Sequence, residues 1–461
     1  MFEKLKQIFA QVDMTEGKPW EKIVAFTIPM VIGNVAQQLY STVDSIVVGQ
    51  YIGDNALAAV GSSTPILNLI LVLFIGISMG AGIMVSQYYG SRDRENLSRT
   101  IGSSITLTAI SSLILMIGGS ALIRPILQML NTPASILDWC ADYLFILLMG
   151  ISGVAYYNMF CGILRGLGDS LSALVYLLIA TAINIVLDLW FVAGLNMGVA
   201  GVALATIIAQ FTSALLCLLK LRRMTDYFDL TFKYLLPDRR NIMTVIRLGL
   251  PSGITQAIFS LAMVVVQSLT NSFGELVIAA NVIIMRVDGF AMMPNFSFGT
   301  AMTTYSGQNV GAGRMDRVHQ GAKQGTLIAA GTSAAITGLI LLFGPYLMGI
   351  FTDTAELIDL SSSMMRVLAA GYIAMAVTQS LSGVMRGAGD TMTPMWISMV
   401  TTVLIRIPLA YGISYLTRTP ELPTGRYECI WISLLTTWVL GALITIFFYR
   451  RGKWTKKGLT A

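Results

Sequence analysis

Two carboxylates lie in stretches of sequence that are otherwise apolar. Asp44 comes two-thirds of the way along residues 23–50, and Asp188 lies in the apolar stretch 171–192. An ionisable side chain at membrane depth costs about 2.5–3.5 kcal/mol on insertion scales, so it marks a pathway or a binding site by default. Asn184 precedes Asp188 by four residues and shares its helical face, and Thr206 lies in the next apolar stretch.

These four side chains offer oxygen ligands only, which suit a hard cation such as Na⁺, or a shared proton, rather than zinc or copper. Two acids in a low dielectric cannot both ionise cheaply. We therefore predict a cation site at Asp44, Asn184, Asp188 and Thr206. Two alternatives stay open: Asp44 could reach water near the Gly49–Gly53 break, and the group could be a polar cluster that only joins helices. On the helix of Asp44, Tyr40 and Gln37 share its face.

The composition indicates what must position these residues. Of 461 residues, 55% are hydrophobic and 12% are charged, whereas soluble domains are about 25% charged. The sequence predicts an all-α polytopic membrane protein with twelve transmembrane helices in two six-helix lobes. The predicted spans are 23–48, 57–86, 101–123, 136–160, 171–192, 197–219, 248–271, 277–304, 324–349, 357–384, 392–416 and 428–449.

Lysine and arginine predict the orientation. Basic residues gather at the N-terminus, after every even-numbered span up to the tenth, and at the C-terminus. The opposite loops hold acids, namely Asp54, Asp138, Glu275, Asp353, Glu356 and Asp359, with Arg418 and Arg426 as the exceptions. We therefore expect both termini on the cytoplasmic side of the cell membrane. This distribution accounts for most of the net charge of +6, so it leaves no basic face for nucleic acid.

An internal repeat divides the chain. GILRGLGDS at 162–170 returns as GVMRGAGDT at 383–391, and QYYGSRD at 87–93 returns as QNVGAGR at 308–314, both at an offset of 221 residues. Six spans in each half give the repeats one orientation, related by a pseudo-twofold axis along the membrane normal, which is a transporter design. The predicted parts are a cytoplasmic segment 1–22, an N-lobe 23–219, a cytoplasmic linker 220–247, a C-lobe 248–449 and a tail 450–461. We interpret the basic character of the linker as topological.

The second half does not repeat the cation site, because Arg406 and Pro408 stand where the amide and carboxylate are expected. Its own acid, Asp288, lies two residues from Arg286, and that pair is either structural or part of the transport pathway. Polar, soft and aromatic residues within the spans of both halves predict a substrate cavity between them. The predicted lining is Gln37, Tyr40, Asn158, Met159, Met292 and Asn295, with Arg286 and Asp288.

Other classes of protein lack their usual signals. The four cysteines have no paired spacing, and the single histidine, His319, lies in a polar connection. No nucleophile–base or metalloprotease motif lies in a span, and the RGLGD and RGAGD turns are not preceded by a strand, as phosphate loops are. We therefore expect neither an enzyme nor a cofactor.

The whole chain resembles the multidrug and toxic compound extrusion (MATE) transporters of the MOP flippase superfamily. The resemblance rests on the two six-helix halves, on Pro29 and Asp44 in the first span, on the paired QYYG/QNVGAGR and RGLGD/RGAGD motifs, and on Asn184, Asp188 and Thr206. Within the family it resembles the DinF-like prokaryotic branch.

The resemblance implies a V-shaped pair of lobes that exports organic, often cationic amphiphilic compounds by alternating access, in exchange for H⁺ or Na⁺. It places the cation at Asp44, Asn184, Asp188 and Thr206, with Tyr40 beside it, and it makes Pro29 a bending point of the first helix. The alternative function is a lipid-linked precursor flippase of the same superfamily. We expect a monomer in the lipid bilayer.

Overall fold

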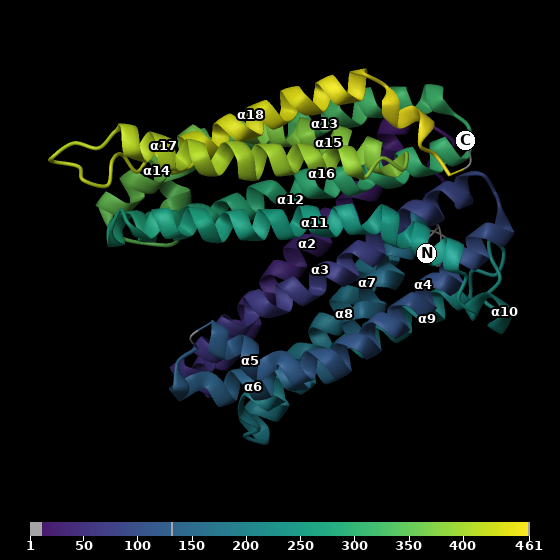
Figure 1. Ribbon diagram of the computed structural model, residues 1–461, viewed down its shortest axis with the longest axis horizontal. Helices are drawn as coiled ribbons and strands as arrows, with labels where there is room; N and C mark the ends of the chain where they lie inside the picture. The colour runs from purple at the N-terminus through teal and green to yellow at the C-terminus, as the bar shows by residue number, and fades with distance from the viewer. Residues whose placement is uncertain (1–11, 131, 460–461) are drawn as a thin grey trace, which may run out of the picture. The chain divides into compact units, whose positions relative to one another are not determined.

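The computed structural model describes residues 12–130 and 132–459, with the backbone alone at 41, 43–45, 54 and 57. Over these residues the chain is helical, and its only strand-like pairing is an isolated bridge between Thr419 and Leu422 (Figure 1). The prediction of an all-α fold is confirmed.

Most of the helices follow one another with short connections, and longer ones occupy residues 223–231 and 417–428 (Figure 1). In chain order they are α2 (Pro19–Tyr51), α3 (Asp54–Gly90), α4 (Arg94–Ile114), η1 (Leu115–Gly119), α5 (Ser120–Met129), α6 (Ala134–Met149), α7 (Ile151–Gly166), α8 (Ser170–Asp188), η2 (Leu189–Gly194), α9 (Gly198–Arg222), α10 (Phe232–Leu235), α11 (Arg239–Asn271), α12 (Glu275–Gly311), α13 (Met315–Gly349), α14 (Ala355–Ala369), α15 (Gly371–Gly387), α16 (Met392–Met399), η3 (Val400–Arg406), α17 (Ile407–Leu416), α18 (Cys429–Arg450) and η4 (Lys453–Lys456).

Ten helical segments in the described chain are long and apolar enough to cross a membrane, and two bent pairs bring the number to twelve. The bent pairs are α6 with α7, at 52°, and α14 with α15, at 43°. They are the fourth and tenth predicted spans, so the bend recurs at the same place in each half. The multi-pass architecture expected from the sequence is confirmed.

The chain divides into two compact units, and two helices are shared between them. The first unit contains Ile28–Gly253, and the second contains Met14–Thr27 and the chain from Ile254 onward. The division therefore falls within α2 and within α11, close to Pro29 and Pro251, which lie inside these helices. A proline in a helix removes one backbone hydrogen bond, so both helices are weakest near the point where they change unit.

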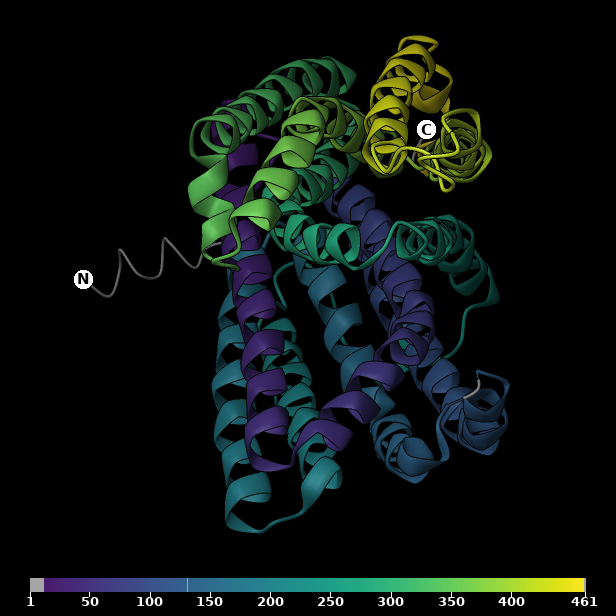
Figure 2. The same ribbon diagram turned by 90° about the vertical axis from the view of Figure 1, so that its left-hand side faces the viewer.

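Within each unit the long helices pack side by side (Figure 2). In the first unit α7 packs against α3 and α9, and in the second α15 packs against α12, α13 and α18. The first half of α11 approaches α3 so closely that a Cβ added to Gly249 would overlap the carbonyl oxygen of Gly76.

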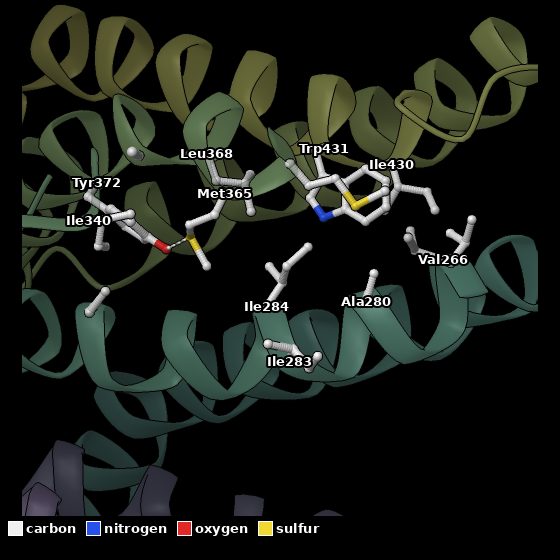
Figure 3. Packing of buried hydrophobic residues seen from close by; sticks show 14 of the residues in the cluster. Val266, Ala280, Ile283, Ile284, Ile340, Met365, Leu368, Tyr372, Ile430 and Trp431 are labelled. Carbon is white, nitrogen blue, oxygen red and sulfur yellow. Dashed lines mark hydrogen bonds between the residues drawn. The ribbon is translucent and has the colours of Figure 1, made fainter. Parts of the chain in front are cut away.

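Figure 3 shows the apolar interior of the second unit, where side chains from α11, α12, α13, α14, α15 and α18 meet. Trp431 and Met365 are almost fully buried there. The labelled members are Val266, Ala280, Ile283, Ile284, Ile340, Met365, Leu368, Tyr372, Ile430 and Trp431. This packing holds α12 and α15, which carry the polar residues of the second half.

The repeated RGLGD and RGAGD turns have the same structure in both units. The Asp169 carboxylate accepts from the Ser172 backbone N–H at 2.9 Å and caps α8, and Asp390 accepts from Thr393 N–H at 3.2 Å before α16. The glycine before each aspartate has a positive φ, 89° and 95°, which a side chain rarely adopts. These turns therefore start the helices that follow the fourth and tenth spans.

The segment before α2 is fastened to the second unit by its backbone. The Met14 N–H donates to Gln308 Oε1 at 3.0 Å. Arg314 Nη1 donates to the Thr15 carbonyl at 2.7 Å, and Arg317 Nη1 donates to the Gly17 carbonyl at 3.0 Å. Part of the predicted 1–22 segment is thus an ordered piece of the second unit.

Candidate cation site and cavity of the first unit

Helix α8 positions the two most buried residues of the predicted cation site. Asp169 caps its start, and Asn184 and Asp188 lie one turn apart near its end, each only 1% exposed. The helix then widens into the π-helical η2 directly after Asp188. Such π segments interrupt the regular hydrogen-bond ladder and are frequent at functional sites.

Asn184 joins residues from three helices. With its amide oriented to satisfy its neighbours, Nδ2 donates to Asp188 Oδ2 at 2.8 Å and to Tyr40 Oη at 3.3 Å, and Oδ1 accepts from the Thr206 backbone N–H at 3.1 Å. Tyr40 comes from α2 and Thr206 from α9, so this amide ties α2, α8 and α9 together. The structure brings these four sequence-predicted residues into one place.

Two predicted ligands are placed less completely. Asp44 belongs to α2 one turn after Tyr40, but its side chain lies outside the described residues. The Thr206 hydroxyl donates to the Val202 carbonyl of its own helix at 3.0 Å, and its oxygen still has lone pairs to offer. Among the described residues no group of three or more His, Cys, Asp or Glu side chains gathers as a metal site would require.

This arrangement is suited to holding one positive charge. Asp188 is a carboxylate taken out of water, which is costly unless it is protonated, paired or hydrogen-bonded. The hydrogen bond from Asn184 offsets part of the cost of burying the Asp188 carboxylate, because hydrogen bonds to a charged acceptor are stronger than those between neutral groups. A bound proton or Na⁺ would offset the remaining cost. The hydroxyl oxygens of Thr206 and Tyr40 are ligands of the type that Na⁺ accepts.

The first unit also contains a cavity of about 190 Å³ beside α2. Gln37 and Asn158, both predicted as cavity residues, line it together with Pro29. The Asn158 amide is oriented by its own helix, since Nδ2 donates to the Val154 carbonyl at 2.9 Å. The cavity and the Asn184 cluster thus share helix α2, with Gln37 one turn before Tyr40.

Sequence reasoning missed four polar residues of this cavity, Asn34, Tyr157, Arg165 and Ser170. Asn34 lies three residues before Gln37, so helical spacing would have placed it on the same face. In the sequence, Arg165 belongs to the RGLGD turn and to the basic residues that predict the orientation. In the structure its Nε donates to the Cys161 carbonyl at 3.1 Å, and its side chain lines the cavity.

Three other predicted cavity residues are buried within their own units. Met159 is 0% exposed in the first unit, and Met292 and Asn295 are 5% and 0% exposed in the second. Asn295 Nδ2 donates to the Tyr372 carbonyl at 3.3 Å, and its Oδ1 accepts from the Ser333 hydroxyl at 2.7 Å. Because these bonds occupy the amide inside the helix packing, Asn295 has a structural part in this conformation.

The predicted pairing of Asp288 with Arg286 is corrected. Arg286 is exposed, and no ion pair joins the two among the described residues. Asp288 Oδ1 instead accepts from the Tyr372 hydroxyl at 3.0 Å and lines a cavity of about 60 Å³ with Arg406. Two residues apart on a helix, Arg286 and Asp288 face different directions, which is why the pair does not form.

Comparison with known proteins shows which chains this one is similar to. The MatE family model matches residues 29–190 and 251–412, once in each half. The probable multidrug resistance protein YoeA of Bacillus subtilis is 28% identical over 458 residues, covering 97% of both chains, and the probable multidrug resistance protein NorM of Thermotoga maritima is 24% identical over 449 residues, covering 95% of this chain and 94% of that one.

Among solved structures, the outward-facing conformation of a multidrug resistance MATE family transporter of the MOP superfamily matches with a TM-score of 0.88 and 26% identity, covering 96% of this chain and 97% of the other. The members of this family are membrane transporters of small molecules and not enzymes. With the family model present in both halves and relatives matched over nearly their full length, the chain belongs to the MATE family of multidrug efflux transporters.

Proposed function

We propose that this transporter exports organic, often cationic amphiphilic compounds in exchange for inward-moving H⁺ or Na⁺, as the resemblance to the DinF-like branch implies. The observation that carries the proposal is the Asn184 amide, which links buried Asp188 on α8 to Tyr40 on α2 and to Thr206 on α9. In this proposal the carboxylates of Asp44 and Asp188 balance the positive charge of the ion, and Asn184, Thr206 and Tyr40 supply neutral contacts.

Helix α2 gives the ion and the substrate a common element. It contributes Tyr40 to the Asn184 cluster, and Pro29 and Gln37 to the cavity. With both acids ionised, the pocket has a net charge of about −2. One bound Na⁺ reduces this to about −1, and one proton on each acid makes the pocket neutral. Each state therefore favours a different position of α2, and Pro29 is where the helix bends. The ion shifts this equilibrium only by its differential affinity for the two states.

The orientation is proposed from the charges in the connections. Lysine and arginine in the linker, the tail and the even-numbered connections place both termini in the cytoplasm under the positive-inside rule. We propose a monomer in the cell membrane, since each half supplies its own packed unit.

A lipid-linked precursor flippase is the second candidate within the superfamily. Such a protein needs a strongly basic cavity for the pyrophosphate group. In the cavity beside α2, Arg165 is the single basic residue among the lining residues that the structure describes. The mixed polar and apolar lining, which includes Met30 and Leu174, favours an amphiphilic organic compound instead.

Transport in proteoliposomes tests the proposal. Proteoliposomes are prepared with purified wild-type protein, with Asp188→Asn or with the control Asp138→Asn. They are loaded with a fluorescent organic cation, and an inward gradient of H⁺ or Na⁺ is imposed. Asp138 is an exposed acid that pairs with Arg124 at 2.8 Å, away from the site. We expect Asp188→Asn to abolish gradient-driven efflux while it still binds the organic cation. The control should transport at the wild-type rate. Wild-type rates in Asp188→Asn would refute the assignment.

A further inference from the structure

The linker between the halves is docked onto helix α4 by specific contacts. Arg94 donates to Asp229 from Nε at 3.0 Å and from Nη2 at 2.7 Å. The Asp229 N–H donates to the Ser98 hydroxyl at 2.8 Å. One turn further along α4, Gly102 lies so close that a Cβ on it would overlap the Tyr234 carbonyl oxygen. The linker next to α10 is therefore packed against α4.

A cavity of about 440 Å³ lies between the linker, α4 and the start of α11. Three basic residues line it, namely Arg99 on α4, Lys233 on α10 and Arg239 at the first position of α11. One acid, Asp238, also lines it, and its carboxylate accepts from the backbone N–H groups of Arg240 and Asn241 at 2.9 and 3.5 Å, where it caps α11.

The basic groups are only partly neutralised. Arg99 pairs with Glu95 at 2.7 Å and lies 3.8 Å from Asp238. Lys233 and Arg239 have no ion pair within the described part of the chain, and the Lys233 ammonium lies 5.5 Å from the centre of the Tyr234 ring. Two cations in the cavity are thus available to an anion.

Ser103 adds a buried polar group to the lining of the cavity. It lines the cavity from α4, is 1% exposed, and its hydroxyl has no hydrogen-bond partner among the described residues. A buried hydroxyl without a partner costs free energy, so such groups are usually satisfied by a bound molecule or water.

The surroundings of the cavity are apolar and lie at the membrane boundary. Phe232 and Leu236, on either side of Lys233, are 80% and 60% exposed, and Met243 on the first turns of α11 is 55% exposed. Helices α4 and α11 both enter the apolar region from here, since membrane-spanning segments begin at Arg94 and Arg239. A ligand in this cavity would therefore have acyl chains or other apolar groups beside these side chains.

We propose that this cavity binds the phosphate of an anionic phospholipid from the leaflet on the linker side. The phosphate would lie between Lys233, Arg239 and the Ser103 hydroxyl, with the acyl chains along Phe232 and Leu236. Basic pockets between membrane helices are known to hold anionic head groups. Arg239 is the first residue of α11, and α11 passes from the first unit to the second. A lipid bound at Arg239 would therefore stabilise the first turn of this shared helix.

The test measures lipid preference in the full-length purified protein. Spin-labelled phosphatidylglycerol and spin-labelled phosphatidylcholine are added in turn to phosphatidylcholine bilayers that contain the protein, and the motionally restricted fraction gives relative affinities. The variants are Lys233→Gln with Arg239→Gln, and Ser103→Ala. The control is Arg222→Gln with Arg223→Gln, which removes the same charge at the end of α9, outside this cavity. Size-exclusion profiles and thermal melting verify that each variant is folded.

We expect the Lys233/Arg239 pair to lower the preference for phosphatidylglycerol about 25-fold, from about fivefold for each basic residue near an anionic head group. We expect Ser103→Ala to lower it about threefold, as the loss of one hydrogen bond would. An unchanged preference in the Lys233/Arg239 variant, or an equal loss in the control, would overturn the proposal. Displacement of the lipid by inorganic phosphate, but not by chloride of equal ionic strength, would reassign the cavity to a soluble phosphate and overturn the lipid assignment.

Discussion

Tyr40→Phe is the most direct test of the link between ion and substrate. The change removes one hydroxyl and keeps the ring, so it cuts the bond between α2 and Asn184 while Asp188 keeps its own bond to that amide. If α2 responds to the ion through Asn184, the substrate affinity of the variant will depend less on the ion.

The magnitude follows from the geometry of the bond. A neutral hydrogen bond contributes about 0.5–1.5 kcal/mol net. The Asn184–Tyr40 distance of 3.3 Å is beyond the usual range, so we take the low end, about 0.5 kcal/mol. The ion raises the dissociation constant of the substrate for which it is exchanged. The ratio of substrate dissociation constants with and without the ion should therefore fall about twofold, because a coupling free energy of this size corresponds to that factor.

The assay is fluorescence polarisation of an organic cation bound to purified protein, at low and high Na⁺ and at pH 8 and pH 6. Tyr156→Phe is the matched control, because Tyr156 Oη donates to the Ile105 carbonyl at the same 3.3 Å in the same unit, away from Asn184. The reasoning fails if Tyr40→Phe keeps the wild-type ratio, or if Tyr156→Phe reduces it equally.

Three other predictions concern topology, the linker and helix packing. In a cysteine-free background, Asp138→Cys should react with an impermeant reagent from outside the cell and Arg239→Cys only from inside; the opposite pattern would reverse the orientation. Arg94 holds the pKa of the Asp229 carboxyl below its usual value, so their contact is present above about pH 4 and is lost as pH falls through the lowered pKa; proteolysis of the linker should then accelerate, and Asp229→Asn should cleave equally fast at neutral pH. Gly249→Ala should lower thermal stability by about 1–3 kcal/mol, since its Cβ has no room beside α3; an unchanged melting temperature would contradict this packing.

The sequence predicted the helices well because their signals are local. Long apolar runs between basic connections mark spans, and the observed helices agree with the predicted ones. The bends between α6 and α7 and between α14 and α15 were not predicted. A single glycine marks each bend, Gly150 at the first and Gly371, 221 residues later, at the second. One glycine in an apolar run is only a weak signal of a bend.

The candidate site was predictable where helical spacing decides proximity, as for Asn184 and Asp188. Contacts between helices were not, because they depend on how the helices rotate and pack. The partners of Asp288 show this: sequence proximity suggested Arg286, but packing brings Tyr372, which is distant in sequence, to 3.0 Å. In the same way, nothing local indicated that Asn295 would be enclosed between Tyr372 and Ser333.

The sharing of α2 and α11 between the units has a consequence for biosynthesis. When the ribosome has made the first six spans, the first unit still lacks the start of α11, so it is completed only after synthesis has passed the linker. Residues Met14–Thr27 are made among the first, yet their binding surface on α12 and α13, including Gln308, Arg314 and Arg317, is made much later. A gene divided within the linker would therefore encode two fragments that each hold a piece of the other's unit, and neither fragment would mature unless both were produced in the same cell.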